Sequence, residues 1–350
     1  MKADIASLAC PVPLPLNSHV VLGHGSGGRL SAALMQEIFL PAFGNPVLNT
    51  LNDQAAVRVE TGRVAFTTDS FVVKPLFFPG GSIGELAVFG TVNDLAVGGA
   101  EPRYLSAAFI LEEGLPLETL RRVVQQMAAA AYRAGVSIVT GDTKVVEKGS
   151  GDQIFITTSG IGMIPDGLEL GPHHVRAEDR ILLSGPIGEH GVTILAQRDG
   201  LEVSGDLVSD TAPLTDLCRA VVKAAPGLRT MRDLTRGGLS SAMNEIAATA
   251  GVGIALEERR IPVSETVMGI CELFGLDPLY VANEGKMIAI VAPEDAEAAL
   301  AAMRTIDTGA GAQMIGTVTA NRRGSVVMRT KFGTDRVVDM LAGDQLPRIC

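Results

Sequence analysis

The order in which strands and helices follow one another most constrains the fold of this chain. In the first half, alternating apolar runs of the kind found in strands cover residues 56–60, 64–69, 71–74, 104–112, 136–146 and 153–164. Thr61-Gly62 between the first two runs predicts a hairpin. Helical spacing predicts helices over 83–97 and 117–134, the first begun by Ser82 and ended by Gly98-Gly99. Strands and helices thus mix without the regular alternation of a parallel doubly wound sheet, which predicts an α+β domain with a largely antiparallel sheet.

The second half repeats this mixture after an interruption at residues 164–180, which is rich in proline, glycine and histidine and therefore marks a domain boundary. Strands are expected at 180–184, up to Asp233, and at 252–256, 286–291, 312–318 and 325–330, and helices at 189–197, 214–225, 239–250, 265–274 and 294–303. We predict four parts: an N-terminal arm (1–18), an N-terminal domain (19–168), a C-terminal α+β domain (169–338) and a flexible tail (339–350).

Composition excludes several kinds of partner. The chain has 350 residues with 29 basic and 39 acidic side chains, a net charge of −10, and only 4% aromatic residues, which disfavours nucleic acid as a partner. The longest apolar stretches, such as 86–100, are broken by Asn93-Asp94 and glycines and fall short of the ~18 residues of a membrane span. Its four cysteines form no CxxC pair, which is typical of free thiols in a reducing cytoplasm. We therefore expect a cytoplasmic protein without a membrane partner.

Four aspartates that lie in turns or near element ends are candidates for a nucleotide-metal site: Asp53, Asp69, Asp94 and Asp142. Converging carboxylates hold Mg²⁺ and bridge it to substrate phosphates. Each aspartate alone is also an ordinary turn former or helix cap. Asp94 is harder to explain in that way, because it lies inside an apolar predicted helix, where an unpaired carboxylate is costly.

Two glycine-rich turns precede predicted helices. In the first, at 23–28, the backbone amides of Gly25, Gly27 and Gly28 suit a phosphate group. It lacks the Gly-Lys-Ser/Thr of a P-loop, and a glycine-rich turn is also a plain linker. The second turn, 233–239, is either another anion-facing turn or a tight connection.

The chain ends in Pro347-Arg348-Ile349-Cys350. A thiol at the tip of about ten extended residues reaches roughly 30 Å, so it can react at one place and be carried to another. The neighbouring terminal carboxylate disfavours the thiolate, so a reactive Cys350 requires a base or cation nearby. The alternative is a terminal cysteine without a function.

Five stretches in the same order, together with the terminal cysteine, resemble the HypE family of hydrogenase maturation proteins, the carbamoyl dehydratases. They are His-Gly-Ser-Gly-Gly at 24–28, Thr-Thr-Asp-Ser-Phe-Val-Val at 67–73, Val-Asn-Asp-Leu-Ala-Val-Gly-Gly-Ala at 92–100, Gly-Asp-Thr-Lys-Val-Val-Glu at 141–147 and Asp-Leu-Thr-Arg-Gly-Gly-Leu at 233–239. The resemblance spans nearly the whole chain, except the arm at 1–18. Sister families of this PurM-like, selenophosphate synthetase-like ATP-binding fold share the aspartates but not the terminal cysteine.

The resemblance implies a two-domain subunit whose N-terminal domain pairs with that of a second copy, so that the homodimer shares a β-barrel with ATP bound nearby. In this family the terminal thiol receives a carbamoyl group from the carbamoyltransferase HypF. ATP then drives its dehydration to a thiocyanate, and the cyanide passes to iron on the HypC–HypD complex for the NiFe-hydrogenase centre.

The resemblance also implies residue roles. Asp53, Asp69, Asp94 and Asp142 are assigned to Mg²⁺-ATP, and Lys144 to the phosphoryl group or the activated amide. Nucleotide contacts are assigned to Thr68, Thr143, Asn93, Gly141, Gly25, Gly27 and Gly28. Cys350 carries the reacting group, and Glu284 is the expected base, with Glu147 as the substitute candidate. For Glu284 the alternative is an ordinary turn carboxylate before a strand.

Two other functions remain open at this point. One is an ATP-dependent kinase or synthetase of the same fold that acts on a small soluble substrate, in which Cys350 is incidental. The other is a non-catalytic scaffold that binds partner proteins through its tail.

Overall fold

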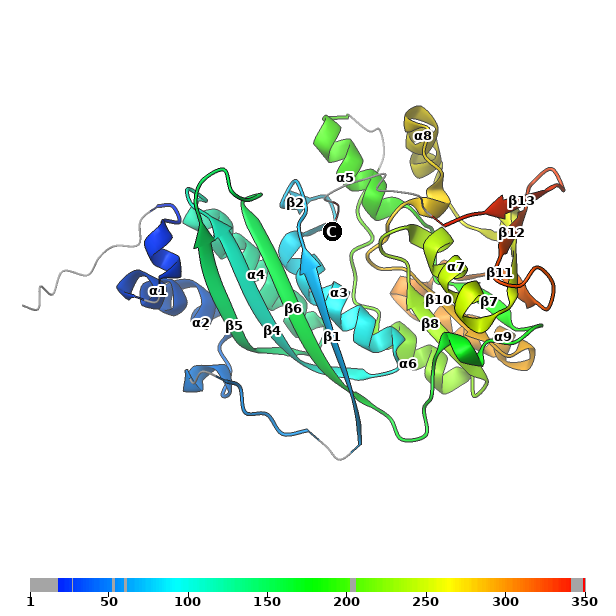
Figure 1. Ribbon diagram of the computed structural model, residues 1–350, viewed down its shortest axis with the longest axis horizontal. Helices are drawn as coiled ribbons and strands as arrows, with labels where there is room; N and C mark the ends of the chain where they lie inside the picture. The colour runs from blue at the N-terminus through cyan, green and yellow to red at the C-terminus, as the bar shows by residue number, and fades with distance from the viewer. Residues whose placement is uncertain are drawn as a thin grey trace, which may run out of the picture.

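The computed structural model describes residues 18–26, 28–51, 54–59, 62–201, 206–340 and 349. Expectations for nearly all of the N-terminal arm, for Gly27, Asp53 and Cys350, and for most of the tail therefore fall outside the described residues. Two sheet-based domains lie side by side (Figure 1). Within the described ranges, no helix is long and apolar enough to cross a membrane.

The N-terminal domain is a four-stranded sheet with its two long helices on one face. In spatial order the strands are β1 (Arg63–Phe71), β6 (Ile154–Ile164), β4 (Glu101–Glu112) and β5 (Ser137–Val146). β6 is antiparallel to both of its neighbours, whereas β4 and β5 are parallel. The helices α3 (Ile83–Val97) and α4 (Leu117–Arg133) pack behind the sheet in Figure 1. The prediction of an α+β domain with a largely antiparallel sheet is confirmed.

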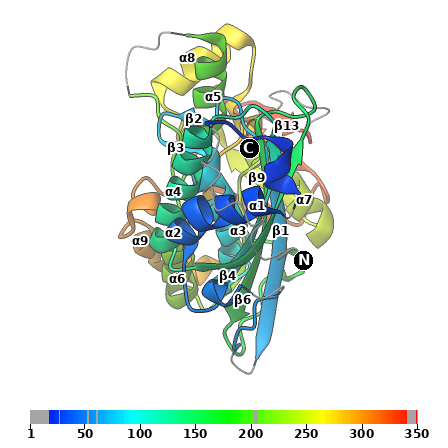
Figure 2. The same ribbon diagram turned by 90° about the vertical axis from the view of Figure 1, so that its left-hand side faces the viewer.

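Smaller elements complete this domain. They are α1 (Arg29–Leu34), a π-helical turn (Met35–Phe39), α2 (Leu40–Phe43), and the short strands β2 (Phe77–Phe78) and β3 (Gly81–Ser82). α1 and α2 lie at the end of the domain away from the C-terminal domain, facing the viewer in Figure 2. α2 contacts α4 and β5 there and so encloses one end of the apolar core.

The helix α3 forms the centre of this domain. Its N-cap Ser82 accepts a hydrogen bond from the backbone N–H of Glu85, as the sequence predicts, and nearly every side chain along it is buried. The helix approaches its neighbours closely because of glycine: a Cβ on Gly84 would meet the carbonyl oxygen of Val123 at 2.5 Å. α3 therefore cannot shift without disturbing α4, which makes it a rigid support for its polar residues.

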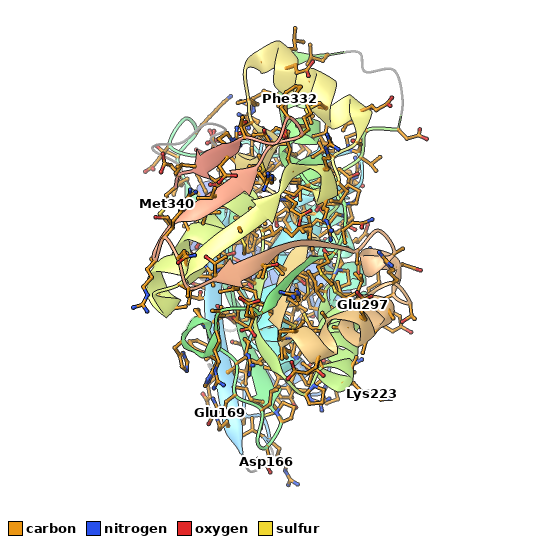
Figure 3. All side chains as sticks on the ribbon, turned by 90° about the vertical axis from the view of Figure 1, so that its right-hand side faces the viewer. Asp166, Glu169, Lys223, Glu297, Phe332 and Met340 are labelled. Atoms are coloured by element: carbon orange, nitrogen blue, oxygen red, sulfur yellow. The ribbon has the colours of Figure 1, made fainter. Side chains whose placement is uncertain are left out.

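The C-terminal domain is built on a seven-stranded sheet. In spatial order the strands are β13 (Asp335–Val338), β12 (Val326–Arg329), β9 (Gly253–Glu257), β11 (Gln313–Thr319), β7 (Arg180–Leu183), β10 (Met287–Val291) and β8 (Leu228–Asp233). Only the β9–β12 pair is parallel. The helices are α5 (Glu189–Asp199), α6 (Thr215–Ala224), α7 (Gly238–Ala250), α8 (Glu265–Phe274) and α9 (Ala296–Met303). Figure 3 views this domain from its far end, with Lys223 of α6 and Glu297 of α9 on one flank and Met340 on the other.

Some predicted elements are wrong. The described residues 54–59 contain no strand, so the expected hairpin around Thr61-Gly62 does not form, and β1 instead pairs with β6. The turn signal is local, whereas the partner of β1 lies some ninety residues later in the chain. The separate strand at 71–74 is also absent, since β1 ends at Phe71, and β13 was not predicted.

The two domains meet along α3, which contacts β8 and α6. A two-pronged ion pair joins them: Arg219 Nε lies 2.8 Å from Glu101 Oε1, and Arg219 Nη2 lies 2.7 Å from Glu101 Oε2. Asn93 of α3 also bridges the domains, donating to the carbonyl oxygen of Ala212 at 3.1 Å and accepting from the N–H of Leu214 at 2.8 Å. The N-terminal sheet and the end of β8 are thus held in fixed relation.

Candidate active site

Three aspartates from three different elements gather where the domains meet. Asp69 lies on the face of β1 that packs against α3, and Asp94 lies on α3 itself. The Thr67 hydroxyl donates to Asp94 Oδ2 at 2.8 Å and so links β1 to the helix. Asp233 ends β8 of the other domain and interacts electrostatically with both of these carboxylates. The structure therefore brings together two of the predicted aspartates and adds one that was not predicted as a ligand.

The electrostatics of this cluster follow from burial and like charge. Burial raises the pKa of Asp69 and of Asp94, and the charge of Asp69 raises the pKa of Asp94 further. Burial, with the charge of Asp94, raises the pKa of Asp233 to about 7. Two arginines oppose the effect: Arg236 lowers the pKa of Asp69, and Arg232 lowers that of Asp94. The site therefore holds more negative charge than it neutralises, which favours a cation.

A pocket of about 530 Å³ opens beside these aspartates, between the domains. Its lining includes Thr67 and Asp94 from the N-terminal domain and Arg232, Asp233 and Thr235 from the C-terminal domain. Carboxylates, hydroxyls and an arginine in one space suit a ligand that combines phosphate with a metal ion. The second glycine-rich turn, which follows Asp233, thus borders the pocket rather than serving only as a connection.

The described acidic residues form only part of a metal site. Among the residues that the structure describes, no three His, Cys, Asp or Glu side chains are placed to hold an ion together. Asp53 lies outside the described residues. The oxygen chemistry and excess negative charge of Asp69, Asp94 and Asp233 nevertheless fit a hard cation such as Mg²⁺.

A second group of predicted residues lies at the other edge of the N-terminal sheet, on β5. Lys144 Nζ lies 3.3 Å from Asp142 Oδ2, and both side chains are exposed. Gly25 packs against this strand, since a Cβ there would meet the backbone nitrogen of Val145 at 2.6 Å. Gly28 is the N-cap of α1, and Thr143 and Gly141 lie on β5 itself. Because β1 and β5 are opposite edges of one sheet, a single protomer does not bring Asp142 to Asp69.

Two predicted nucleotide contacts have side chains engaged elsewhere. Thr68 lies on the face of β1 opposite to Asp69 and accepts a hydrogen bond from the Ser159 hydroxyl at 2.9 Å. Its neighbour Thr67 is the threonine that faces the pocket. Asn93 uses its amide to join the two domains, as described above. The alternation of a strand would identify Thr67 only if the buried face were known beforehand.

Glu284 lies buried in the loop before β10, in a third group. Its backbone N–H donates to Asp210 Oδ1 at 3.1 Å, and the N–H of Gly285 donates to Asp210 Oδ2 at 3.3 Å. Lys286 follows, with Nζ 3.5 Å from Glu189 and 3.8 Å from Asp210. The Glu284 loop is therefore held by the buried carboxylate of Asp210, and Glu284 is buried rather than lying in an exposed turn. The substitute candidate Glu147 is exposed just after β5.

The end of the chain reaches the same region. Ile349 is buried, in one apolar cluster with Ile194 of α5 and with Ala282, two residues before Glu284. Its carbonyl oxygen lies 2.6 Å from His190 Nε2. Sequence reasoning missed His190 and Asp210 as neighbours of Glu284 and of the tail, because both are single polar residues without a motif.

The fold and these sites define a class of protein. Residues 51–164 match the family described as AIR synthase related protein, N-terminal domain, and residues 176–329 match the corresponding C-terminal domain. The chain is therefore a two-domain protein of the AIR synthase-related, PurM-like class, as the resemblance implied.

Individual relatives identify the family within this class. "Carbamoyl dehydratase HypE" of Cupriavidus necator is 55% identical over 340 residues, which covers 97% of each chain. The crystal structure of hydrogenase maturation protein HypE in complex with ATP has a TM-score of 0.91 at 49% identity and covers 94% of this chain and 99% of that one. A crystal structure of a HypE–HypF complex has a TM-score of 0.78 at 45% identity, with coverage of 88% and 100%. The chain belongs to the HypE family of carbamoyl dehydratases.

Proposed function

We propose that this chain catalyses the ATP-dependent dehydration of an S-carbamoyl group on Cys350 to a thiocyanate, which supplies the cyanide ligand of the NiFe-hydrogenase iron. The observation that carries the proposal is the 55% identity to a carbamoyl dehydratase over 97% of both chains. The ATP in a HypE crystal structure that covers 94% of this chain supports the choice of phosphoryl donor.

The chemistry requires activation of the carbamoyl oxygen, which is a poor leaving group. Transfer of the γ-phosphoryl group of ATP to this oxygen releases ADP. Loss of phosphate then breaks the C–O bond, while both nitrogen protons leave and a C≡N bond forms. The balance is S-carbamoyl cysteine plus ATP giving S-cyano cysteine, ADP and phosphate. The site must therefore provide a base and a cation beside the transferred group.

We assign the base to Glu284 and the cation to Lys144. Glu284 is buried, and the hydrogen bonds from the backbone of its loop to Asp210 keep it in place. Its loop belongs to the region where Ile349 packs, which supports its action on a group carried by the adjacent Cys350. Lys144 extends from β5, where Asp142 accompanies it.

We assign Mg²⁺-ATP to the acidic pocket between the domains. The ion would be held by Asp69, Asp94 and Asp233. The further predicted ligands are Asp53 and Asp142. Bound there, Mg²⁺ neutralises the triphosphate. Arg232, which also pairs with Glu245 at 2.6 Å, and Arg236 lie beside the same carboxylates and are the proposed partners of the phosphate oxygens. The glycines of the first turn and Gly141, with Thr143, remain the proposed phosphate contacts of the β5 edge.

A homodimer would complete this site. β1 and β5 are the two edges of the N-terminal sheet, and unpaired edges are where another chain adds. The sheet face turned away from α3 exposes Val64, Phe66 and Ile110, the first two 46% and 70% exposed. We propose that a second copy covers this face and closes the barrel, so that its β5 edge brings Asp142 and Lys144 to the acidic pocket of the first copy.

The proposed partners follow from the reaction. A carbamoyl donor must reach Cys350, and the relative solved in a HypE–HypF complex supports HypF in that role. The HypC–HypD complex is the proposed acceptor of the cyanide. Four cysteines without a CxxC pair, two of them buried free thiols, are consistent with the proposed cytoplasmic location.

Intact mass spectrometry tests the reaction. The protein is incubated with carbamoyl phosphate, ATP, Mg²⁺ and the partner transferase, and its mass is followed in time. We expect a carbamoyl adduct that then loses water, with one phosphate released per water lost. Cys350→Ala should abolish both mass changes, whereas Cys218→Ala, at a buried cysteine of α6, should retain them.

Three outcomes would argue against parts of this proposal, and two of them favour a competing function. ATP turnover on a soluble substrate that survives in Cys350→Ala favours a kinase or synthetase of this fold. A variant Asp94→Asn that still delivers cyanide refutes the Mg²⁺-ATP assignment, and retention of every function without ATP favours a scaffold.

A further inference from the structure

The residue before the terminal cysteine is held by a buried histidine. His190, near the start of α5, has no exposed surface, and its Nε2 lies 2.6 Å from the carbonyl oxygen of Ile349. Its other ring nitrogen, Nδ1, lies 2.8 Å from the Ser209 hydroxyl oxygen. Phe78 forms a T-shaped contact with the imidazole, and the two ring centroids lie 5.5 Å apart. The ring is thus held at both nitrogens and by a T-shaped aromatic contact.

The partners of His190 determine which nitrogen carries the proton. The carbonyl oxygen of Ile349 can only accept, so Nε2 carries the hydrogen and donates it. Burial lowers the pKa of His190, which keeps the ring neutral, so Nδ1 accepts from the Ser209 hydroxyl. Ser209 Oγ in turn lies 2.7 Å from the Thr211 hydroxyl oxygen and accepts from the Thr211 N–H at 3.2 Å. Every polar atom of this chain of contacts has a partner.

The segment that orients His190 also holds the loop of Glu284. Asp210 lies between Ser209 and Thr211, its side chain is fully buried, and it accepts from the backbone N–H groups of Glu284 and Gly285. Ser209 is anchored on the N-terminal domain, where its N–H donates to the carbonyl oxygen of Pro79 at 2.9 Å. One short segment, 209–211, therefore contacts both His190, which binds Ile349, and the loop of Glu284.

We propose that His190 is a positioning residue for the dehydration: with Ser209 it grips the Ile349 carbonyl and so fixes the reacting cysteine in register with the Glu284 loop. The role of His190 in dehydration rests on the proposed function, whereas the contact between His190 and Ile349 does not depend on it. Because the Cα atoms of adjacent residues lie about 3.8 Å apart, a contact at Ile349 acts directly next to the residue that carries the reacting group. A tail that must also visit another protein needs this contact to be reversible.

Access to the tail tests the grip without any enzymatic activity. Full-length protein in a Cys10→Ser background, without ATP, is treated with limiting trypsin, which cleaves after Arg348 and removes the last two residues. In parallel, Cys350 is alkylated with iodoacetamide, and both rates are followed by intact mass. His190→Phe keeps the ring volume and the Phe78 contact but has no donor, and we expect both rates to rise about tenfold, the value of one buried hydrogen bond.

Matched variants separate the grip from general loosening. His190→Gln retains an N–H donor and should restore rates to within about twofold of the wild type. Ser209→Ala, which removes the group that orients the ring, should raise both rates, and it serves as the second probe if His190→Phe does not fold. His173→Phe, at an exposed histidine of the connector between the domains (residues 165–179, from the end of β6 to the start of β7), should change neither rate.

Two results would overturn the proposal. One is wild-type rates in a folded His190→Phe or Ser209→Ala variant, and the other is equal rates in His190→Phe and His190→Gln. A failure of the proposed function gives a different result. The variants would still change the trypsin and alkylation rates as expected, but Cys350→Ala would retain ATP-dependent turnover.

Discussion

Replacing Asp233 with asparagine should make the stability of the protein less dependent on pH. Asp233 ends β8 at the pocket between the domains, where burial and the charge of Asp94 raise its pKa to about 7 from an ordinary value of 3.8. A carboxyl whose pKa is raised on folding destabilises the folded state once it ionises. The destabilisation is absent below the unfolded pKa, grows as the pH rises towards about 7, and is constant above it.

The magnitude follows from the size of this shift. Each pKa unit corresponds to about 1.4 kcal/mol, so the wild type should lose about 3 kcal/mol between about pH 5 and about pH 8 through Asp233 alone. Asparagine has nearly the same size and no charge, so Asp233→Asn should escape this loss. For cooperative unfolding of 350 residues the entropy is about 0.7 kcal/mol per kelvin, and the melting temperature of the variant relative to the wild type should rise by about 4 °C over this range.

Differential scanning calorimetry from about pH 5 to about pH 8, without Mg²⁺ or ATP, measures this difference. Asp69 and Asp94 also have raised pKa values and are present in both proteins, so the comparison measures Asp233 together with its electrostatic coupling to these two carboxylates. Asp166→Asn, at an exposed aspartate of the connector, is the matched control and should track the wild type at every pH (Figure 3). A variant-minus-wild-type difference that does not change with pH would refute the reasoning.

Three further perturbations test other parts of the structure. Gly141→Ala should destabilise the protein by about 1–3 kcal/mol in chemical denaturation, because its Cβ would collide with a carbonyl of β4; Gly269→Ala, at an open position of α8, should be neutral or stabilising, and equal effects would contradict this. Phe66→Asp should convert the proposed dimer to a monomer in sedimentation velocity, whereas Phe332→Asp, at a phenylalanine of the other domain that is even more exposed, should not; a Phe66→Asp dimer would argue against the proposed barrel interface. Asp94→Asn should weaken Mg²⁺-ATP binding about tenfold or more in titration calorimetry, and unchanged affinity would remove Asp94 from the metal site.

Features with a local cause were predicted well. The bounds of α3 and α8 agree with the predicted helices 83–97 and 265–274, because apolar spacing, a serine N-cap and a terminal glycine lie within a few residues of one another. The predicted hairpin at Thr61-Gly62 was wrong because it relied on a local signal for a feature that is not local. Its turn signal was local, but strand pairing is decided by a partner elsewhere in the chain, and β1 found it in β6.

In the candidate site, too, single residues could be predicted from the sequence, but their contacts could not. Asp94 was found from the sequence because a carboxylate inside an apolar helix is unusual, and Asp69 was found as one of four aspartates expected in turns or near element ends. Their union with Asp233 was not, because it depends on how β8 of one domain packs on α3 of the other. Thr68 was assigned from its motif, whereas the position of Thr67 at the pocket depends on which face of β1 packs against α3.

The sequence by itself determined the family, the α+β class and the presence of a terminal cysteine, because motifs and periodicity are written in consecutive residues. Only the tertiary structure decided that Asp142 and Lys144 lie on the opposite sheet edge from Asp69, that Asp210 holds the Glu284 loop, and that His190 binds the end of the chain. These contacts join residues far apart in the chain. Their energies come from burial and from the choice of hydrogen-bond partners, and both exist only once the domains have packed.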